Sequence, residues 1–363
     1  MNEIQKLTAD GFNHDSHARI EIDLALTSLK IALRSYFSTY QTFKYSLNIF
    51  DDESNVQEST DSRHNFSYCE FCAETILHFQ HFAELVCKEF LRDDHPLLAT
   101  TSLQKPDVLH KLLHDQSLTE DEEVKLRSIE FSVALETLVS LIKNESIANL
   151  DKVKFVKDYY LALKELNNLR NKIWHRGLFI LRYPSLDEFI GRYILPFVKQ
   201  VTSHPKYESY DHIWKYNELT CGIDPIEEII DAYSTVSIET GKIAFLKELG
   251  RAAYINPLSK SRPTKKTNTY FSFSEFIDRK HIERAKRIAA SEAELDFSEI
   301  FKCPVCGIES LIAYSELDDD FPDHEKEPYV YTYKVECECC KLNIEGGIKN
   351  PSGYGYSEIP DFF

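Results

Sequence analysis

Four cysteines near the end of the 363-residue chain are spaced as two pairs of metal ligands. Cys303 and Cys306 form one CxxC pair, and Cys337 and Cys340 form a second pair about one hairpin further on. Paired thiolates at this spacing are typical of a zinc ribbon, in which four sulfurs close a tetrahedron around Zn²⁺. A full thiolate set leaves no position for water, so the spacing predicts a structural metal. Cys339 is a spare thiol that could replace Cys337 or Cys340.

The cysteine pattern leaves the role of this segment open. The alternative to a metal site is a small core that contains free cysteines. A zinc ribbon, in turn, can bind nucleic acid, bind protein, or only stabilise a fold too small to be stable by itself. The sequence does not choose among these roles.

A second group of candidate catalytic residues lies near the end of a predicted helix. At 100° per residue, Asn171 and His175 fall opposite the apolar stripe of this helix, and Arg170 lies at the flank of the stripe. Imidazole suits general acid–base work near neutral pH, and the guanidinium fork matches phosphate oxygens. RNA cleavage needs a proton acceptor for the 2′-hydroxyl, a proton donor for the leaving 5′-oxygen, and positive charge at the phosphate. A second copy of the helix across a two-fold axis would complete this set.

This arrangement resembles the HEPN superfamily over roughly residues 16–205. The resemblance is carried by Arg170-Asn171-x-x-x-His175 at the end of a late helix, and by the aromatic-rich run Phe79-Gln-His-Phe82-Ala-Glu-Leu85. It implies a homodimeric, metal-independent endoribonuclease with Arg170 and His175 as catalytic residues and Asn171 as a supporting polar residue. It also implies RNA as substrate, a setting in anti-phage abortive infection or a toxin–antitoxin system, and a phage or antitoxin protein as trigger.

Three other interpretations stand beside the nuclease hypothesis. In the first, the helix end is solvated and His175 only caps it. In the second, the bundle is a non-catalytic HEPN-like module and the chain is a binding or scaffolding protein whose ribbon contacts a partner. A third, a DNA-binding regulator, is disfavoured by the acidic residues between positions 318 and 327, which would repel phosphate.

Helices must position the Arg-His group. Apolar residues recur at helical spacing in five segments of the first two hundred residues, which predicts an antiparallel bundle. Capping boxes at Ser67-x-x-Glu70, Thr119-x-x-Glu122 and Ser185-x-x-Glu188 mark three predicted starts. The segments span residues 22–37, 67–90, 119–141, 155–177 and 185–205. We expect Gly177 to cap the fourth helix and Pro196 to bend the fifth.

Alternating runs at residues 311–317 and 329–336 predict two strands in the last part of the chain. The predicted fold class is therefore mainly α. We expect a HEPN-like helical bundle at residues 1–205, an irregular helical connecting region with a basic arm at 206–300, and a small β zinc ribbon with a tail at 301–363. Asp224-Pro225 is a predicted helix start within the connecting region.

The charge distribution restricts how the chain can meet nucleic acid. Lys+Arg 42 against Asp+Glu 59 gives a net charge of −17, which argues against a protein that coats nucleic acid non-specifically. Residues 251–287, however, hold ten basic and three acidic side chains, and their cations lie close to aromatic residues. They could grip single-stranded RNA, or could form an ordinary solvated surface. No secretory signal or long apolar run is evident, so we expect a cytoplasmic protein without membrane contact.

Overall fold

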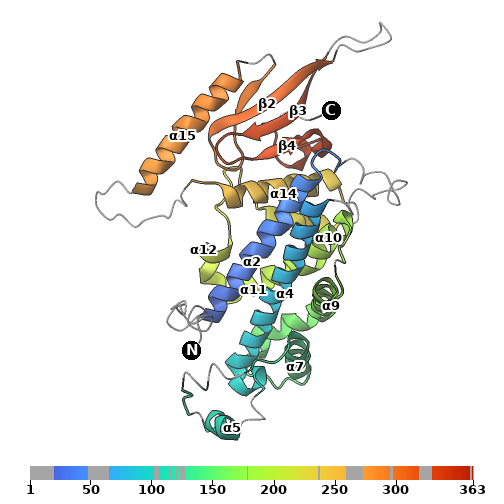
Figure 1. Cartoon of the computed structure of the whole chain (residues 1–363), viewed down its shortest axis with the longest axis vertical. Coiled ribbons are helices and arrows are strands. Elements are labelled where there is room, and N and C mark those ends of the chain that lie inside the picture. The colour runs from blue at the N-terminus through green and yellow to red at the C-terminus, as the bar shows by residue number, and fades with distance from the viewer. Residues whose placement is uncertain are drawn as a thin grey trace, which may run out of the picture. The chain divides into compact units, whose positions relative to one another are not determined.

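The computed structural model of the chain is mainly helical and ends in one four-stranded antiparallel sheet (Figure 1). Both features confirm the predicted mainly α class with a small C-terminal β element. Among the described residues, no helix has both the length and the apolar character that crossing a membrane requires. The structure describes residues 20–47, 65–101, 106–114, 116–119, 122, 127–177, 179–235, 238–258, 273–294, 297–318, 329–359 and 362.

The chain divides into two compact units, each assembled from three separate segments. Unit 1 comprises Met1–Ala32, Ile76–His175 and Phe197–Trp214. Unit 2 comprises Leu33–Thr75, Arg176–Pro196 and Lys215–Phe363. Helices α2 (Ile20–Ser38) and α4 (Phe66–Asp94) contribute residues to both units. The domain boundaries expected at residues 205 and 300 stay a prediction.

Unit 1 is helical and has an aromatic core. The rings of Phe82 and Phe197 meet edge to face with centroids 6.2 Å apart, and Phe90 meets Phe155 at the same distance. Besides parts of α2 and α4, the helices of this unit are η4 (Pro96–Ala99), α5 (Pro106–Leu113), α7 (Phe131–Lys143), α8 (Leu150–Val153), η6 (Lys154–Tyr159), α9 (Tyr160–Arg176), α11 (Leu195–Thr202), η8 (Glu208–Tyr210) and α12 (Asp211–Trp214), of which α9 and α11 extend into unit 2 by one end.

Helix α4 begins slightly earlier than predicted. The backbone N–H of Tyr68 donates to Asn65 Oδ1 at 3.0 Å, so Asn65 is the N-cap and Ser67 lies in the first turn. The predicted capping box at Ser67 is therefore wrong as a helix start. The helical spacing of apolar residues predicted for this segment is confirmed, because the residues that form its apolar stripe are all buried: Cys72, Ile76, Phe79, Ala83, Val86 and Phe90.

The third predicted helix is confirmed at its start, where Glu122 is helical, but is wrong in its continuity and in its buried face. Thr119 and Glu122 do form a capping box, since the N–H of Thr119 donates to Glu122 Oε2 at 2.9 Å. Helix α7 nevertheless begins only at Phe131, because residues 127–130 are not helical and Ser128 pairs with Thr100 in a β-bridge. Val133, which continues the helical spacing of apolar residues four positions after Ile129, is 47% exposed. The residues of α7 that are buried instead are Phe131, Ala134, Leu135, Leu138, Val139 and Ile142.

Helix α9 carries the predicted catalytic residues. It begins at Tyr160 and not at Phe155, because a 3₁₀ segment, η6, occupies the preceding residues. Its last residue is Arg176, and Gly177 follows with φ 68°, which confirms the predicted C-terminal cap. Three leucines anchor the helix in unit 1: Leu163, Leu166 and Leu169 are buried.

The predicted fifth helix is interrupted by a π-helical turn. Helix α10 (Tyr183–Phe189) begins two residues before the predicted start, η7 (Ile190–Ile194) is π-helical, and α11 follows. Proline has no N–H to donate to the carbonyl four residues back, so an irregular turn just before Pro196 fits the predicted break.

Unit 2 combines helices with the sheet. Its strands are β1 (Glu299–Lys302), β2 (Glu309–Asp318), β3 (Tyr329–Cys337) and β4 (Asn343–Glu345), in the order β1-β2-β3-β4. Strands β2 and β3 confirm the two predicted runs, whereas β1 and β4 are too short to show alternation. The remaining elements include η1 (Thr39–Thr42), α10, η7, α13 (Pro225–Ser234), α14 (Thr240–Ile255), α15 (Phe273–Glu292), η9 (Gly346–Ile348) and η10 (Ser352–Tyr354).

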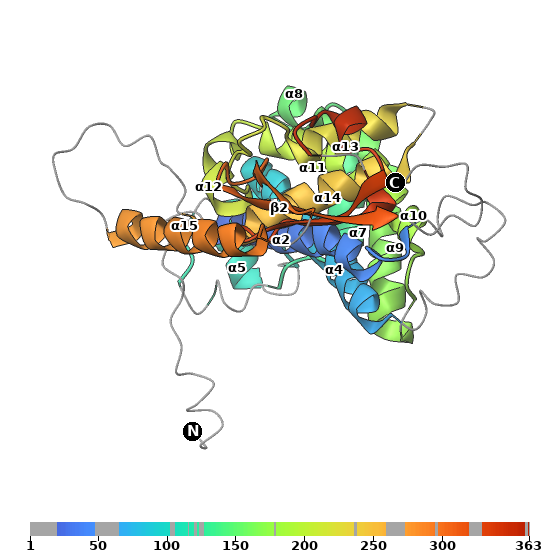
Figure 2. The same cartoon turned by 90° about the horizontal axis from the view of Figure 1, so that it is seen from above.

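Helices α14 and α15 of unit 2 contact the sheet. Helix α15 packs beside β2, and α14 contacts β4 (Figures 1 and 2). Helix α13 starts where predicted, since Asp224 Oδ1 accepts the N–H of Ile226 at 3.1 Å. The predicted basic arm at residues 259–269 lies outside the described residues, but most of α15, its helical continuation, is described.

Candidate metal centre and candidate active site

The sulfurs of Cys303, Cys306, Cys337 and Cys340 gather at one end of the sheet. All four side chains are buried, and their Sγ atoms lie within 4.8 Å of one another. Cys303 Sγ lies 3.5 Å from Cys340 Sγ, and Cys306 Sγ lies 3.7 Å from Cys337 Sγ. These distances are far longer than a disulfide bond of about 2 Å. They are close to the separation of roughly 3.8 Å that tetrahedral Zn–S bonds of about 2.3 Å require. The four predicted ligands therefore form a possible metal-binding site.

Two similar backbone turns present the sulfurs. In the first, Gly307 donates its N–H to the carbonyl of Cys303 at 2.9 Å. In the second, Lys341 donates to the carbonyl of Cys337, also at 2.9 Å. Gly307 and Lys341 each follow the second cysteine of a pair, and both have positive φ, 73° and 59°. The backbone thus folds each CxxC pair into the same compact shape.

The rest of unit 2 fixes both turns. Thr220 Oγ1 donates to the carbonyls of Cys303 and Pro304 at 3.1 and 3.0 Å, which holds the first turn. A Cβ at Gly307 would lie 2.8 Å from the methyl carbon of Thr220, so this contact requires glycine. At the second turn, His281 Nε2 lies 3.0 Å from the carbonyl oxygen of Cys339. Any metal held here would therefore connect several segments of unit 2.

Cys339 lies beside this group of four and not within it. Its side chain is buried, and its hydrogen bond with Cys306 raises the pKa of Cys339. The four sulfurs that come together are those of the CxxC pairs, so the geometry favours Cys337 and Cys340 over Cys339 as ligands.

A buried carboxylate ties α14 to the second turn. Glu248 is fully buried, and its carboxylate accepts from Gln41 Nε2 and from the N–H of Asn343, both at 2.6 Å. Arg251 pairs with the same carboxylate through two nitrogens and also donates to the carbonyl of Lys341. The cysteine turns and the adjacent helices therefore share one hydrogen-bond network.

The predicted catalytic residues lie in the last two turns of α9 in unit 1, with Arg170 and His175 about 140° apart around the helix axis. Arg170 Nη1 donates to Asn171 Oδ1 at 3.0 Å, and both residues are half-buried. His175, one turn after Asn171, is exposed, and its neighbour Trp174 is 65% exposed. The structure thus brings Arg170 and Asn171 together and leaves His175 open to solvent. Among the described residues of unit 1, none hydrogen bonds to the imidazole.

A histidine on α4 lies near the Arg170 guanidinium and was missed by sequence reasoning. Burial lowers the pKa of His81, and the charge of Arg170 acts in the same direction. The nearby Glu84 opposes this shift. His81 Nδ1 lies 2.8 Å from Ser28 Oγ of α2, which orients the ring. A depressed pKa makes His81 a neutral hydrogen-bonding group at pH 7. The run from Phe79 to Leu85 contains His81, but its pattern is one of aromatic residues. A single histidine has no spacing that would indicate a functional site.

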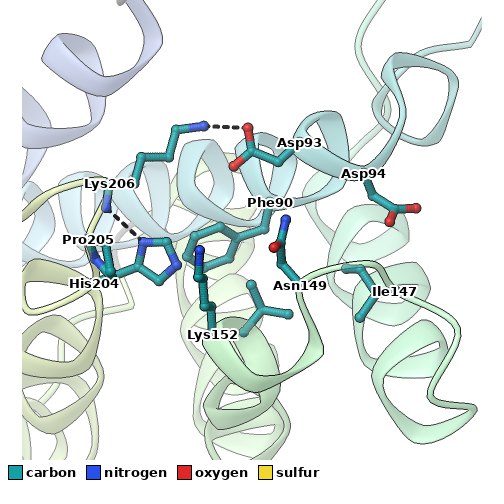
Figure 3. A pocket seen from close by; sticks show the side chains of 10 residues that line it. Phe90, Asp93, Asp94, Ile147, Asn149, Lys152, His204, Pro205 and Lys206 are labelled. Carbon is teal, nitrogen blue, oxygen red and sulfur yellow. Dashed lines mark hydrogen bonds and ion pairs between the residues drawn. The ribbon is translucent and has the colours of Figure 1, made fainter.

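Unit 1 also contains a cavity of about 260 Å³, and the predicted catalytic residues do not line it (Figure 3). Lys206 crosses one side of it, pairing with Asp93 at 2.6 Å and donating its N–H to His204 Nδ1 at 3.1 Å. The lining residues are Phe90, Asp93, Asp94, Ile147, Asn149, Lys152, Val153, His204, Pro205 and Lys206. None of the predicted catalytic residues is among them. The candidate active site on α9 is therefore not part of this cavity.

Comparison with known proteins finds no matching family model, no matching curated protein and no matching solved structure.

Proposed function

We propose that the chain is a metal-independent endoribonuclease of HEPN type. The observation that carries the proposal is the arrangement on α9, where Arg170 and Asn171 are hydrogen bonded and His175 is exposed one turn later. These are the side chains that cleavage of a ribose-phosphate linkage needs. These side chains lie on a helix surface and do not line the 260 Å³ cavity of unit 1. This location fits a site that a second copy of the chain completes.

The proposed reaction transfers two protons and needs no bound metal. A neutral imidazole accepts the proton of the ribose 2′-hydroxyl, and the 2′-oxygen attacks the adjacent phosphorus. The bond from phosphorus to the 5′-oxygen breaks, and an imidazolium donates a proton to that oxygen. The products are a 2′,3′-cyclic phosphate and a 5′-hydroxyl end. Arg170 balances the charge that develops on the phosphate.

Two copies of the chain supply the two imidazoles in this proposal. One His175 acts as base and the other as acid, so a homodimer with two-fold symmetry brings both motifs to one phosphate. Asn171 holds the guanidinium of Arg170 in place through the 3.0 Å hydrogen bond. By resemblance to the family, the setting is anti-phage defence or a toxin–antitoxin system, and a phage or antitoxin protein is the trigger.

The metal centre has a structural role in this proposal, with Zn²⁺ as the metal. The donor set supports zinc, because four buried thiols whose sulfurs lie within 4.8 Å of one another, two pairs of them at 3.5 and 3.7 Å, suit its tetrahedral preference. Cys303, Cys306, Cys337 and Cys340 would hold the ion and close its coordination sphere. Bound there, zinc would cross-link the two turns and take no part in RNA cleavage.

Cleavage of RNA should depend on His175 and not on added metal. General acid–base catalysis contributes roughly 10²–10⁴-fold to rate, so we expect His175→Ala to slow cleavage by about that factor. The measurement is the initial rate of cleavage of a fluorescent single-stranded RNA in the presence of EDTA. The exposure to EDTA is limited to minutes so that a structural metal ion stays bound. His212→Ala is the matched control, because His212 is also an exposed histidine of unit 1. It should cleave like the unmodified chain.

Two results would count against the nuclease. Cleavage that His175→Ala leaves unchanged would assign the activity to another group or to a contaminant. A purified dimer that cuts no RNA, with or without metal, would favour the scaffolding interpretation. In that case, expression of the chain should not harm cells.

A further inference from the structure

The outward face of α15 is cationic in a chain whose net charge is −17. Between Asp278 and Glu292 this helix carries five cations and three carboxylates. Ala285 and Ala289 are buried, which identifies the side of the helix that packs in unit 2. The cations Arg279, Lys280, Arg284, Lys286 and Arg287 are all exposed.

Not all of these cations are used in ion pairs. Arg279 pairs with Glu283, and Lys286 pairs with Glu309, both in exposed geometry where an ion pair contributes little. Among the described residues, Arg284 and Arg287 have no carboxylate partner. They lie three residues apart on the face that also carries Lys280, so the helix displays a strip of positive charge about 10 Å long. No ion pair with a described residue explains the two arginines of this strip.

An exposed aromatic ring follows the strip. Phe297, in the connection between α15 and β1, is 50% exposed and has φ 60°. A large apolar side chain held open in a left-handed conformation is unusual, because such backbone normally favours glycine or asparagine. Phe297 follows Arg287 by ten residues in the chain. Cations and exposed aromatic rings are the groups that bind single-stranded nucleic acid, by charge and by base stacking.

We propose that the α15 strip (Lys280, Arg284 and Arg287), together with Phe297, is a binding surface for single-stranded RNA. The two free arginines contact consecutive phosphates, and Phe297 stacks on a base. A single strand is favoured over a duplex because its bases are free to leave the stack. Binding at this surface is separate from chemistry in unit 1, so the proposal stands whether or not the chain cleaves RNA.

The test uses full-length protein carrying His175→Ala, so that any nuclease activity is removed. Fluorescence anisotropy with a labelled 12-nucleotide RNA gives the affinity as a function of salt. Arg284→Glu/Arg287→Glu should weaken binding at least tenfold and should lower the slope of log affinity against log salt by about one to two. Phe297→Ala should weaken binding about tenfold and leave the slope unchanged. Thermal unfolding and metal content should match the parent, because these side chains point to solvent.

A matched control separates a local site from general charge. Lys152→Glu/Lys157→Glu makes the same change in net charge at exposed lysines of unit 1, and we expect it to alter affinity by less than twofold. An equal loss in this control would overturn the proposal, as would unchanged binding by the α15 variant. Equally tight binding of poly-glutamate, lost in the same variant, would also overturn it and would indicate an acidic protein partner.

Discussion

Replacing Cys306 with serine should abolish metal binding and unfold the sheet of unit 2. The oxygen that replaces Sγ cannot complete a set of four thiolates, and structural zinc contributes roughly 10 kcal/mol in zinc-finger peptides. That is comparable with the whole free energy of unfolding of a typical domain. The sheet has short outer strands and relies on the two cysteine turns to connect them. We therefore expect rapid hydrogen exchange in β2 and β3 of the variant.

The measurements are metal content by atomic absorption and exchange by mass spectrometry. The unmodified chain should hold one zinc ion, and a chelator should produce the same exchange pattern as the variant. Cys69→Ser is the matched control, because Cys69 is a half-buried cysteine of unit 2 outside the metal centre. It should keep both zinc and protection. A chain that is free of metal yet keeps slow exchange in β2 and β3 would refute a structural role for the ion.

Replacing Asp187 with alanine should destabilise unit 2 by about 3–5 kcal/mol. Lys247 has no exposed surface, and its ammonium lies 2.6 Å from Asp187 Oδ1. The same nitrogen lies 4.0 Å from the centre of the Tyr183 ring and 4.9 Å from that of Tyr36. Removal of the carboxylate leaves a buried ammonium whose only remaining attraction among these groups is to the faces of two aromatic rings. Urea unfolding at pH 7 measures the loss.

The double variant Asp187→Leu/Lys247→Met tests the reason for that loss. Burial raises the pKa of Asp187 and lowers the pKa of Lys247, so folding disfavours the ionised form of each group at neutral pH. Removing both charges together should therefore be near neutral or stabilising, as for other buried pairs. If the double variant lost as much stability as Asp187→Ala, cavity formation would be the cause instead of an unpaired charge.

The features that sequence predicted best are those set by local rules. The four metal ligands follow from spacing alone, and the α4 stripe follows from a periodicity that tertiary packing did not override. Gly177 could be predicted because a left-handed residue at a helix end favours glycine. Each of these is visible as a short local pattern: two CxxC pairs, one helical periodicity and one glycine at a helix end.

Features that depend on distant partners could not be predicted. The face of α7 was misjudged because the residues before it pair with Thr100 and are not helical. His81 has chemical interest only through its neighbours Ser28 and Arg170, which are 53 and 89 positions away in the chain. The Asp187–Lys247 pair likewise joins residues 60 positions apart that show no pattern by themselves.

The assembly of unit 2 from both ends of the chain has a consequence for synthesis. Tyr40 Oη accepts the N–H of Glu345, and Lys44 pairs with the carboxylate of the same residue, which is made some 300 residues later. At 5–20 residues per second the ribosome needs roughly 15–60 s to reach it. During that interval Tyr40 and Lys44 lack this native partner, so unit 2 stays incomplete in a nascent or prematurely terminated chain. Such chains should be frequent clients of chaperones that bind near the ribosomal exit tunnel.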